Sequence, residues 1–508
     1  SNSGSFTSCS FTTDNAAVLE TSGDRTPSQV RLWGVNGIDF RGCTFANTAG
    51  GTSGSCGCGI RAEDAGFSID TYCPAGIYLG DCTCEPSHAS YCTFQGFDKA
   101  VEANTTGSQY AVLINQARFT GNGTGVEVNG NNYTTVTRCD FDLTQVPSLC
   151  TSATGLKLSG STGFLVEENT FHRTANGLQP ATYGVQVSNS GYSDNSLYRN
   201  QFANLTDGVY IIGTNGTKTK GLSVTCGAFS GNARDIHLAS GATVARSFGS
   251  SLMGADNDFS HTSASSISCA GLQSLNYYYS ASTGHVPYNP SLSVTTYATA
   301  AANGCRSTLC DNGPMQLPRD LSSADTHSLL SDSHGNTALS ADRNVRLAMG
   351  DSILDLDLLA GWYDVMDEPA AKYALAETRF QQNTDNATVF STIESEYLDT
   401  DADRAEYDNY RAFDALKKAL ALSSDNRSAD WPAATSGQIA ELQRIAEART
   451  GRSSVMAQGV LCFFFDECPD ENVASEQQDT RSQRITSEEE SDSRVMAFPN
   501  PSSDRLNM

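Results

Sequence analysis

Apolar positions in the front part of the chain follow a short repeated unit. Most copies place Cys or Asn two positions before a Phe, and then have Gly followed by two apolar residues with one position between them. The phenylalanines at positions 94, 119, 141, 171, 202 and 229 are separated by 25, 22, 30, 31 and 27 residues. The Gly-apolar-x-apolar segments of four copies lie at 125–128, 155–158, 184–187 and 208–211.

The unit predicts two or three short strands with alternating apolar positions, broken by Gly, Asn, Ser and Thr turns. One unit is too small to bury its own apolar face, whereas stacked units share a continuous core. A propeller blade needs about 40 residues, and a leucine-rich repeat needs Leu where this chain has Phe, Cys and Asn. The pattern therefore predicts a right-handed parallel β-helix over residues 1–315, with a Cys-rich loop insertion at 50–92 and with Cys or Asn forming a ladder.

These rungs resemble the right-handed β-helix repeats of bacterial secreted proteins, a group that includes pectate lyases, polygalacturonases and large adhesins. The resemblance covers roughly residues 1–300. It implies the fold and leaves the activity open, because one fold can carry unrelated functions.

Apolar residues take helical spacing in the back half, as in Tyr410, Phe413, Leu416 and Leu420. We expect four or five antiparallel helices of 12–20 residues between 341 and 459, within an α-helical domain at 316–459, with breaks near 367–369, 383–386, 399–403 and 423–432. The segment 435–438 reads as a capping box. The helices are predicted to close an open end of the β-helix or, alternatively, to bind a partner. A disulfide-bearing segment and acidic linker follow at 460–493.

Charge and cysteine separate the two halves. The chain has 508 residues and a net charge of −25; residues 1–315 hold 15 Lys+Arg and 22 Asp+Glu, and residues 316–508 hold 17 and 35. So acidic a surface disfavours nucleic acid and anionic membranes as partners. The sequence contains no run of 18 apolar residues, so no transmembrane helix is predicted. Residues 1–10 show no signal peptide, and we expect the chain to be the C-terminal part of a larger protein.

Of the 16 cysteines, 14 precede residue 311, which favours an oxidising compartment. Those at 43, 92 and 139 match the ladder position and are predicted to be buried thiols. The others form local groups without zinc-finger spacing, so disulfides are the favoured interpretation and a zinc site the less favoured one. The disulfide candidates are Cys56, Cys58, Cys73, Cys82 and Cys84 in the insertion, the local pair Cys305 and Cys310, and the local pair Cys462 and Cys468.

The C-terminal residues 494–508 resemble the start of the sorting domain of the type IX secretion system. The matching residues are Phe498, Pro499, Asn500, Pro501 and Asp504. The resemblance implies a bacterium of the Bacteroidota type and export across the outer membrane by the type IX machinery, ending in release or surface attachment. The remaining strands of that domain do not follow, so either the chain is truncated here or the match is accidental; an incomplete sorting domain is the favoured interpretation.

Candidate catalytic residues are few. Asp140 and Asp142 flank inward Phe141, and paired carboxylates can serve as acid and base or hold Ca²⁺, with Arg138 as the nearest base for a lyase. The polygalacturonase signatures are absent as a set, so a solvated acidic face is favoured. Asp235 and His237 are predicted to form a structural pair.

A second acidic group lies between two predicted helices. Asp399, Asp401 and Asp403 begin like an EF-hand loop and are weak Ca²⁺ candidates, but Arg404 replaces the required Gly and Tyr410 the bidentate Glu. A turn with Asp403 as N-cap is favoured, and no other cofactor is predicted. The tyrosines at 277–279 and 288 are expected to pack at the end of the β-helix rather than to bind sugar.

The sequence as a whole predicts a secreted structural or adhesive protein, without enzymatic activity, that is part of a type IX-exported surface adhesin or appendage. Its stacked rungs would resist extension, and its loops would contact glycans, cells or neighbouring copies in an oligomer or filament. The alternatives are a β-helix polysaccharide lyase or hydrolase and a non-catalytic glycan-binding module.

Overall fold

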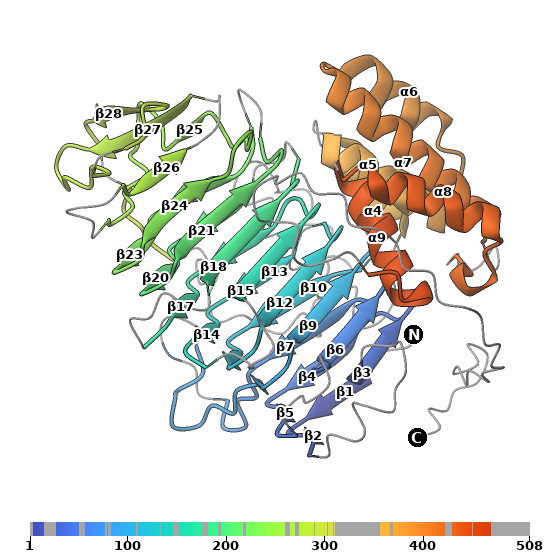
Figure 1. The fold of residues 1–508 in the computed structure, drawn as a ribbon, viewed down its shortest axis with the longest axis horizontal. Helices are drawn as coiled ribbons and strands as arrows, with labels where there is room; N and C mark the ends of the chain where they lie inside the picture. Colours follow the sequence, from blue (N-terminus) through green and yellow to red (C-terminus); the bar gives the residue numbers. More distant parts are fainter. Residues whose placement is uncertain are drawn as a thin grey trace, which may run out of the picture. The chain divides into compact units, whose positions relative to one another are not determined.

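The computed structural model describes residues 4–468, with its longer gaps at 15–26, 50–55, 146–151, 175–180, 260–264, 311–355 and 422–428; residues 469–508 lie outside the description. Residues 1–468 form one compact unit. Three parallel sheets, named A, B and C here, stack strand upon strand through its front part (Figure 1). The chain passes from A to B to C in each turn and then begins the next rung.

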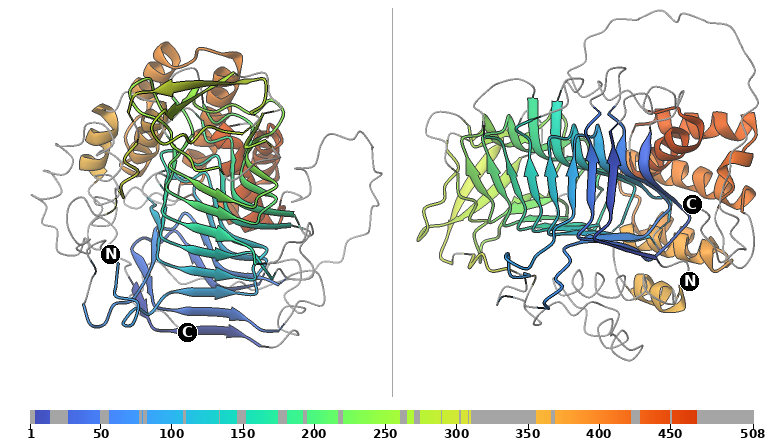
Figure 2. Two further views of the ribbon diagram at one scale, coloured as in Figure 1. Left: turned by 90° about the vertical axis from the view of Figure 1, so that its left-hand side faces the viewer. Right: turned by 90° about the horizontal axis from the view of Figure 1, so that it is seen from below.

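The strands of each sheet follow in stacking order. Sheet A contains β1 (Gly4–Thr7), β4 (Ile38–Arg41), β7 (Phe67–Asp70), β10 (Val112–Asn115), β13 (Thr135–Thr137), β16 (Leu165–Glu167), β19 (Ser196–Tyr198) and β22 (Ser223–Thr225). Sheet B contains β2 (Ser10–Thr13), β5 (Thr44–Asn47), β8 (Thr93–Gln95), β11 (Arg118–Thr120), β14 (Asp140–Asp142), β17 (Thr170–His172), β20 (Gln201–Ala203) and β23 (Ala228–Ser230). Sheet C contains β3 (Ser28–Trp33), β6 (Cys58–Glu63), β9 (Lys99–Asn104), β12 (Thr124–Asn129), β15 (Ser152–Ser159), β18 (Ala181–Ser188), β21 (Asp207–Ile212), β24 (Arg234–Leu238) and β26 (Ile267–Cys269). Figure 2 shows the rows of strands from two further sides.

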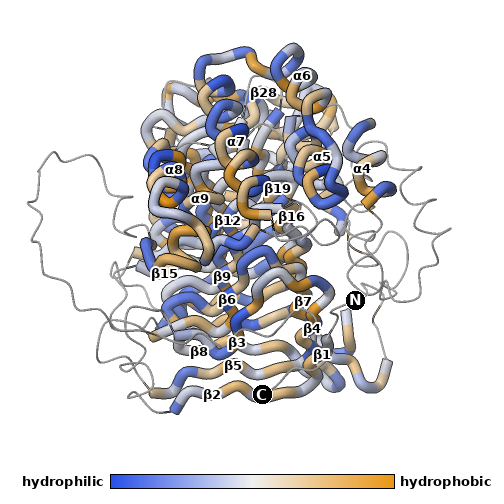
Figure 3. The backbone as a smooth tube through the Cα atoms, turned by 90° about the vertical axis from the view of Figure 1, so that its right-hand side faces the viewer, coloured by the Kyte–Doolittle hydropathy of each residue, from blue (hydrophilic) through white to orange (hydrophobic). Residues whose placement is uncertain are grey.

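The repeated Phe and Gly of the sequence pack against each other inside the stack. Phe141 is fully buried on sheet B, with ring centroids 4.7 Å from both Phe119 and Phe171. A Cβ added to Gly155 on sheet C would lie 2.5 Å from the Phe171 ring. Gly is therefore required because the ring occupies the space of a side chain. The alternating hydrophobic and hydrophilic positions can be followed along the strands in Figure 3.

The predicted Cys/Asn ladder lies at the corner between sheets A and B. Asn169 accepts the backbone N–H of Cys139 through Oδ1 (2.9 Å) and donates through Nδ2 to the Val136 carbonyl of the same earlier rung (2.9 Å). Two rungs are thus joined by both ends of one amide.

Cysteine performs the same task with a single atom. The Sγ of Cys92 accepts the N–H of Cys43 (3.2 Å) and donates to the Phe40 carbonyl (3.4 Å). Cys43, Cys92 and Cys139 are buried thiols, as predicted. Burial raises the pKa of Cys139 to about 12, so this thiol stays protonated.

The far end of the stack is closed by a small sheet of β25 (Ser247–Phe248), β27 (Leu275–Ser280) and β28 (Val294–Thr299). Tyr277 is fully buried there, and its hydroxyl accepts the N–H of Asn257, in keeping with the predicted packing role. The predicted local pair of Cys305 with Cys310 is wrong, since Cys305 is bonded to Cys226, 79 positions earlier. Cys226 takes the left-handed backbone conformation at the A–B corner.

Six α-helices follow in the described part of the back half. They are α4 (Leu356–Val365), α5 (Pro369–Gln381), α6 (Ala387–Glu396), α7 (Asp401–Ala419), α8 (Ser436–Glu447) and α9 (Gly451–Phe465), with a 3₁₀ turn, η2 (Trp431–Ala433), before α8. The four predicted breaks agree with those between α4 and α8, and Thr435 and Gln438 form the expected capping box. The break between α8 and α9 was not predicted, so the described part has six helices instead of the expected four or five, and α4 and α6, with 10 residues each, are shorter than expected. The predicted boundary at 459 falls inside α9. Within the described residues, no helix is long and apolar enough to cross a membrane.

Helix α9 packs across the outward face of sheet C, over β6, β9 and β12, rather than over an end of the stack. Arg31 and Arg61 donate to the carbonyls of Phe463 and Cys462 (2.6 and 3.0 Å), where the helix dipole favours positive charge. Arg452, in the first turn, donates to the Gly130 carbonyl (2.9 Å). The predicted end-closing role of the helices is therefore corrected to that of a lateral cover.

Candidate functional site

The predicted acidic pair lies on the outward side of sheet B. Asp140 and Asp142 flank buried Phe141 on β14, as the alternation requires. His172 of β17, which the sequence did not single out, lies beside them, with its Nε2 3.0 Å from Asp140 Oδ1. This hydrogen bond raises the pKa of His172 because it stabilises the protonated ring.

Arg138 does not join the two acids. It occupies the A–B corner with φ of 54°, and its guanidinium forms an ion pair with Glu168 of the next rung (3.0 Å). Glu168 is shared with Arg199 one rung further (3.1 Å). Asp140, Asp142 and Arg138 therefore do not form the predicted arrangement of two acids and an opposing base. The corner conformation turns Arg138 towards Glu168 at the corner of the next rung.

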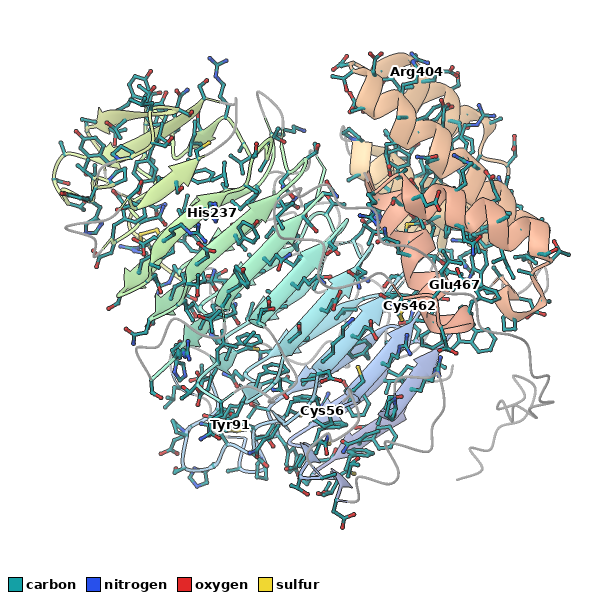
Figure 4. The ribbon with its side chains drawn as sticks, in the orientation of Figure 1. Cys56, Tyr91, His237, Arg404, Cys462 and Glu467 are labelled. Atoms are coloured by element: carbon teal, nitrogen blue, oxygen red, sulfur yellow. A yellow bond between two sulfur atoms is a disulfide. The ribbon has the colours of Figure 1, made fainter. Side chains whose placement is uncertain are left out.

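A group that the sequence analysis missed lies on the outward side of sheet C, where three rings stack across adjacent strands. The Tyr183 and Tyr210 centroids are 5.3 Å apart, and those of Tyr210 and His237 are 4.9 Å apart. Asp207 lies below them with a fully buried carboxylate, which accepts from Arg234 Nη2 at 2.8 Å. These five residues are called the sheet C aromatic cluster; Figure 4 labels its His237 on β24.

The cluster corrects the predicted Asp235–His237 pair. His237 Nδ1 lies 3.4 Å from Asp207 Oδ1, while Asp235 is buried and accepts from Asn232 (3.0 Å). Asp235 occupies the position that Gly takes in other rungs, and its side chain does not share the outward side with His237. Tyr210 and His237 each stand between the two apolar residues of their copy, and this shared position could have predicted that they lie side by side on the outward face.

The rest of the same outward row is charged. Glu102 pairs with Arg61 (3.0 Å) and Lys99 (2.9 Å), and Glu127 pairs with Lys99 and Lys157 (3.0 Å each). Burial opposes the ionisation of Glu127, but the two lysines outweigh it and hold its pKa below the usual range. The row therefore continues from a part covered by α9 into the partly exposed aromatic cluster.

Two local disulfides lie among the remaining cysteine candidates, Cys73–Cys84 and Cys462–Cys468. The disulfide prediction is wrong for Cys58, which is a buried thiol, and Cys56 is buried with its N–H donating to Asp98 Oδ2 (2.6 Å). Cys82 and Cys310 lie outside the described residues.

The EF-hand-like segment is a helix start. Thr400 is the N-cap of α7, which corrects the assignment of Asp403, and the Asp403 carboxylate accepts the N–H of Thr400 as the third residue of a capping box. Asp399 precedes this helix, and Asp401 is its first residue. No group of three or more His, Cys, Asp or Glu residues suited to a metal ion occurs within the described ranges. The sorting motif at 498–504 lies outside them.

Comparison with known proteins agrees with this geometry. A family model described as "Right handed beta helix region" matches residues 75–248, which are 174 of the 508 residues. The described strands within this range form a right-handed β-helix. The predicted fold class is therefore confirmed, a mainly β solenoid followed by a small α-helical part. No curated protein and no solved structure matches the chain, and β-helix repeats occur in both enzymes and non-enzymes.

Proposed function

We propose that the protein is a secreted, non-catalytic adhesive β-helix that binds glycans on the outward face of sheet C. The stacked rings of the aromatic cluster carry this proposal. Tyrosine rings offer an apolar face with a polar tip, and a sugar ring presents C–H groups and hydroxyls that match both. Arg234 lies beside the rings with a partly exposed guanidinium, which supplies donors in a fixed fork.

Adhesion without turnover is supported by how the charges are used. The buried Asp207 carboxylate forms an ion pair with Arg234 and lies 3.4 Å from His237 Nδ1, so it is engaged within the cluster. Arg138 is likewise engaged, because its guanidinium forms an ion pair with Glu168.

Secretion by the type IX route is part of the proposal. It is supported by the segment 498–504, which resembles the start of a sorting domain, and by three disulfides within residues 4–468. The partners would be the type IX machinery during export and surface or environmental glycans afterwards.

A glycan array with the purified chain tests the proposal. We expect binding without release of reducing or unsaturated ends, a loss of about tenfold or more in affinity for Tyr210→Ala, and unchanged affinity for Tyr397→Ala in the helical part. Absence of binding to any glycan would overturn it.

A polysaccharide lyase or hydrolase is the second candidate, favoured by the Asp140–His172 pair on sheet B. Cleavage of pectin- or alginate-type polymers that disappears in Asp140→Asn and in Asp142→Asn would establish it in place of adhesion.

A further inference from the structure

The end of the β-helix carries an exposed apolar surface. Within the described part of the chain, six of the seven exposed large apolar side chains belong to residues 247–299, the segment from β25 to β28. They are Leu252 (81% exposed), Met253 (48%), Val286 (44%), Tyr288 (45%), Leu292 (106%) and Tyr297 (43%). Isolated exposed leucines are ordinary, but a group of this kind marks an interaction surface.

An open strand edge accompanies this surface. β28 is the outermost strand of its three-stranded sheet and pairs with β27 alone among the described strands. Tyr297 projects from it and stacks on Tyr278 at 5.2 Å. Proteins commonly protect such an edge with charged residues or proline, and the sequence of β28, VTTYAT, has neither.

The charge pattern identifies the partner. Residues 259–305 contain no Asp, Glu, Lys or Arg, in a chain where these make up 18% of residues and the net charge is −25. Two copies of so acidic a chain repel each other unless the contact keeps their carboxylates apart by about a Debye length of 8–10 Å or more. The uncharged segment 259–305, which contains β28, is therefore the surface on which a second copy can dock with the least repulsion.

We propose that two copies of the chain associate through β28, strand edge to strand edge, around a two-fold axis. Antiparallel pairing of β28 with its own copy lets each edge satisfy the other's free backbone groups, and an isologous contact of this kind closes as a dimer. Leu292 and Tyr297 then lie within the contact. The dimer uses a different surface from the aromatic cluster and does not depend on glycan binding.

Sedimentation velocity of the full chain at pH 7.5 tests the proposal. We expect a concentration-dependent dimer that becomes tighter when NaCl rises from about 50 mM to about 500 mM, since salt screens the repulsion. Leu292→Glu and Tyr297→Glu should each weaken dimerisation by about tenfold or more, because each places two carboxylates in the contact.

Leu79→Glu is the control, an exposed leucine elsewhere whose exposure (44%) is close to that of Tyr297 (43%), and should leave the dimer unchanged. Thermal melts of each variant show that the fold is retained, and glycan binding is measured on the same samples to keep the two proposals apart. A chain that remains monomeric at all concentrations overturns the proposal. A dimer insensitive to both substitutions at β28 also overturns it.

Discussion

Two rows of side chains run along the same stacked rungs and obey opposite rules. Inside sheet B, Phe follows Phe at ring distances of 4.5–5.2 Å from rung to rung, so identical neighbours stabilise each other. On the outward side of sheet C, Arg31, Arg61, Glu102, Glu127 and Lys157 occupy matching positions. Like charges at strand spacing repel, and two neighbouring pairs of this row are alike, Arg31 with Arg61 and Glu102 with Glu127. Each pair therefore needs a further group: Lys99 bridges the two glutamates (2.9 and 3.0 Å), and the two arginines donate to carbonyls of α9. The interior therefore repeats in sequence, whereas the exterior changes from rung to rung.

The largest effect should come from removing one ring of the inner row. Phe141→Ala leaves a cavity between two stacked rings and is expected to destabilise the fold by about 3–5 kcal/mol in urea unfolding. Phe141→Leu keeps most of the volume and should cost about 1–2 kcal/mol. Equal losses for the two variants would contradict the idea that stacked volume stabilises this row.

The next effect concerns the buried part of the outer row. Glu102→Gln leaves the Arg61 guanidinium, which is 1% exposed, without its carboxylate and should cost about 2–4 kcal/mol. Glu441→Gln, which breaks the exposed pair with Arg444, should change stability by less than about 1 kcal/mol. If both substitutions cost the same in thermal unfolding, burial does not determine the strength of the outer row.

The ladder at the A–B corner tests whether a thiol can replace an amide. Asn169→Ala removes the hydrogen-bond partner of the Cys139 N–H and of the Val136 carbonyl, and should lower the free energy of unfolding by about 1–3 kcal/mol. Asn169→Cys should lose less than half as much, because Cys92 already bonds both groups of its own earlier rung. Hydrogen exchange of the Cys139 amide would report the same order, and a Cys variant no better than Ala would contradict it.

The smallest effect is expected at the exposed pair on sheet B. Asp140→Asn should lower the pKa of His172 towards 6.5, as followed by NMR titration, and change stability by less than about 1 kcal/mol. Because the folded-state pKa is raised, the pair stabilises the fold below pH 6.5 and this contribution fades as pH rises through the folded value. Asp142→Asn, which acts on the ring only through space, should shift the pKa less.

The inner row is what the sequence made predictable. Phe141, Gly155 and Asn169 recur because each contacts its own counterpart in the next rung, so period and fold could be read together. The breaks between helices were predictable for a related reason, since caps such as Thr435–Gln438 are local.

The outer features were not predictable from the same pattern. Arg138 was assigned to the acids because no sequence rule showed that its corner position takes a left-handed conformation. The partner of Cys305 lies 79 positions away, and the cover of sheet C by α9 depends on Arg61 meeting a carbonyl 401 positions later. The aromatic cluster was missed because outward positions carry no repeat.

The Cys226–Cys305 bond also determines how tension would travel through the chain. A pull applied between the helical part and the early rungs reaches the β-helix at Cys305 and passes directly to the A–B corner at Cys226. Residues 227–304, which include the terminal sheet and the charge-free strand β28, lie in a covalently closed loop outside that load path. Reduction of this single bond would place those residues in series with the rest of the chain, so that the end of the solenoid would be the first part to peel away.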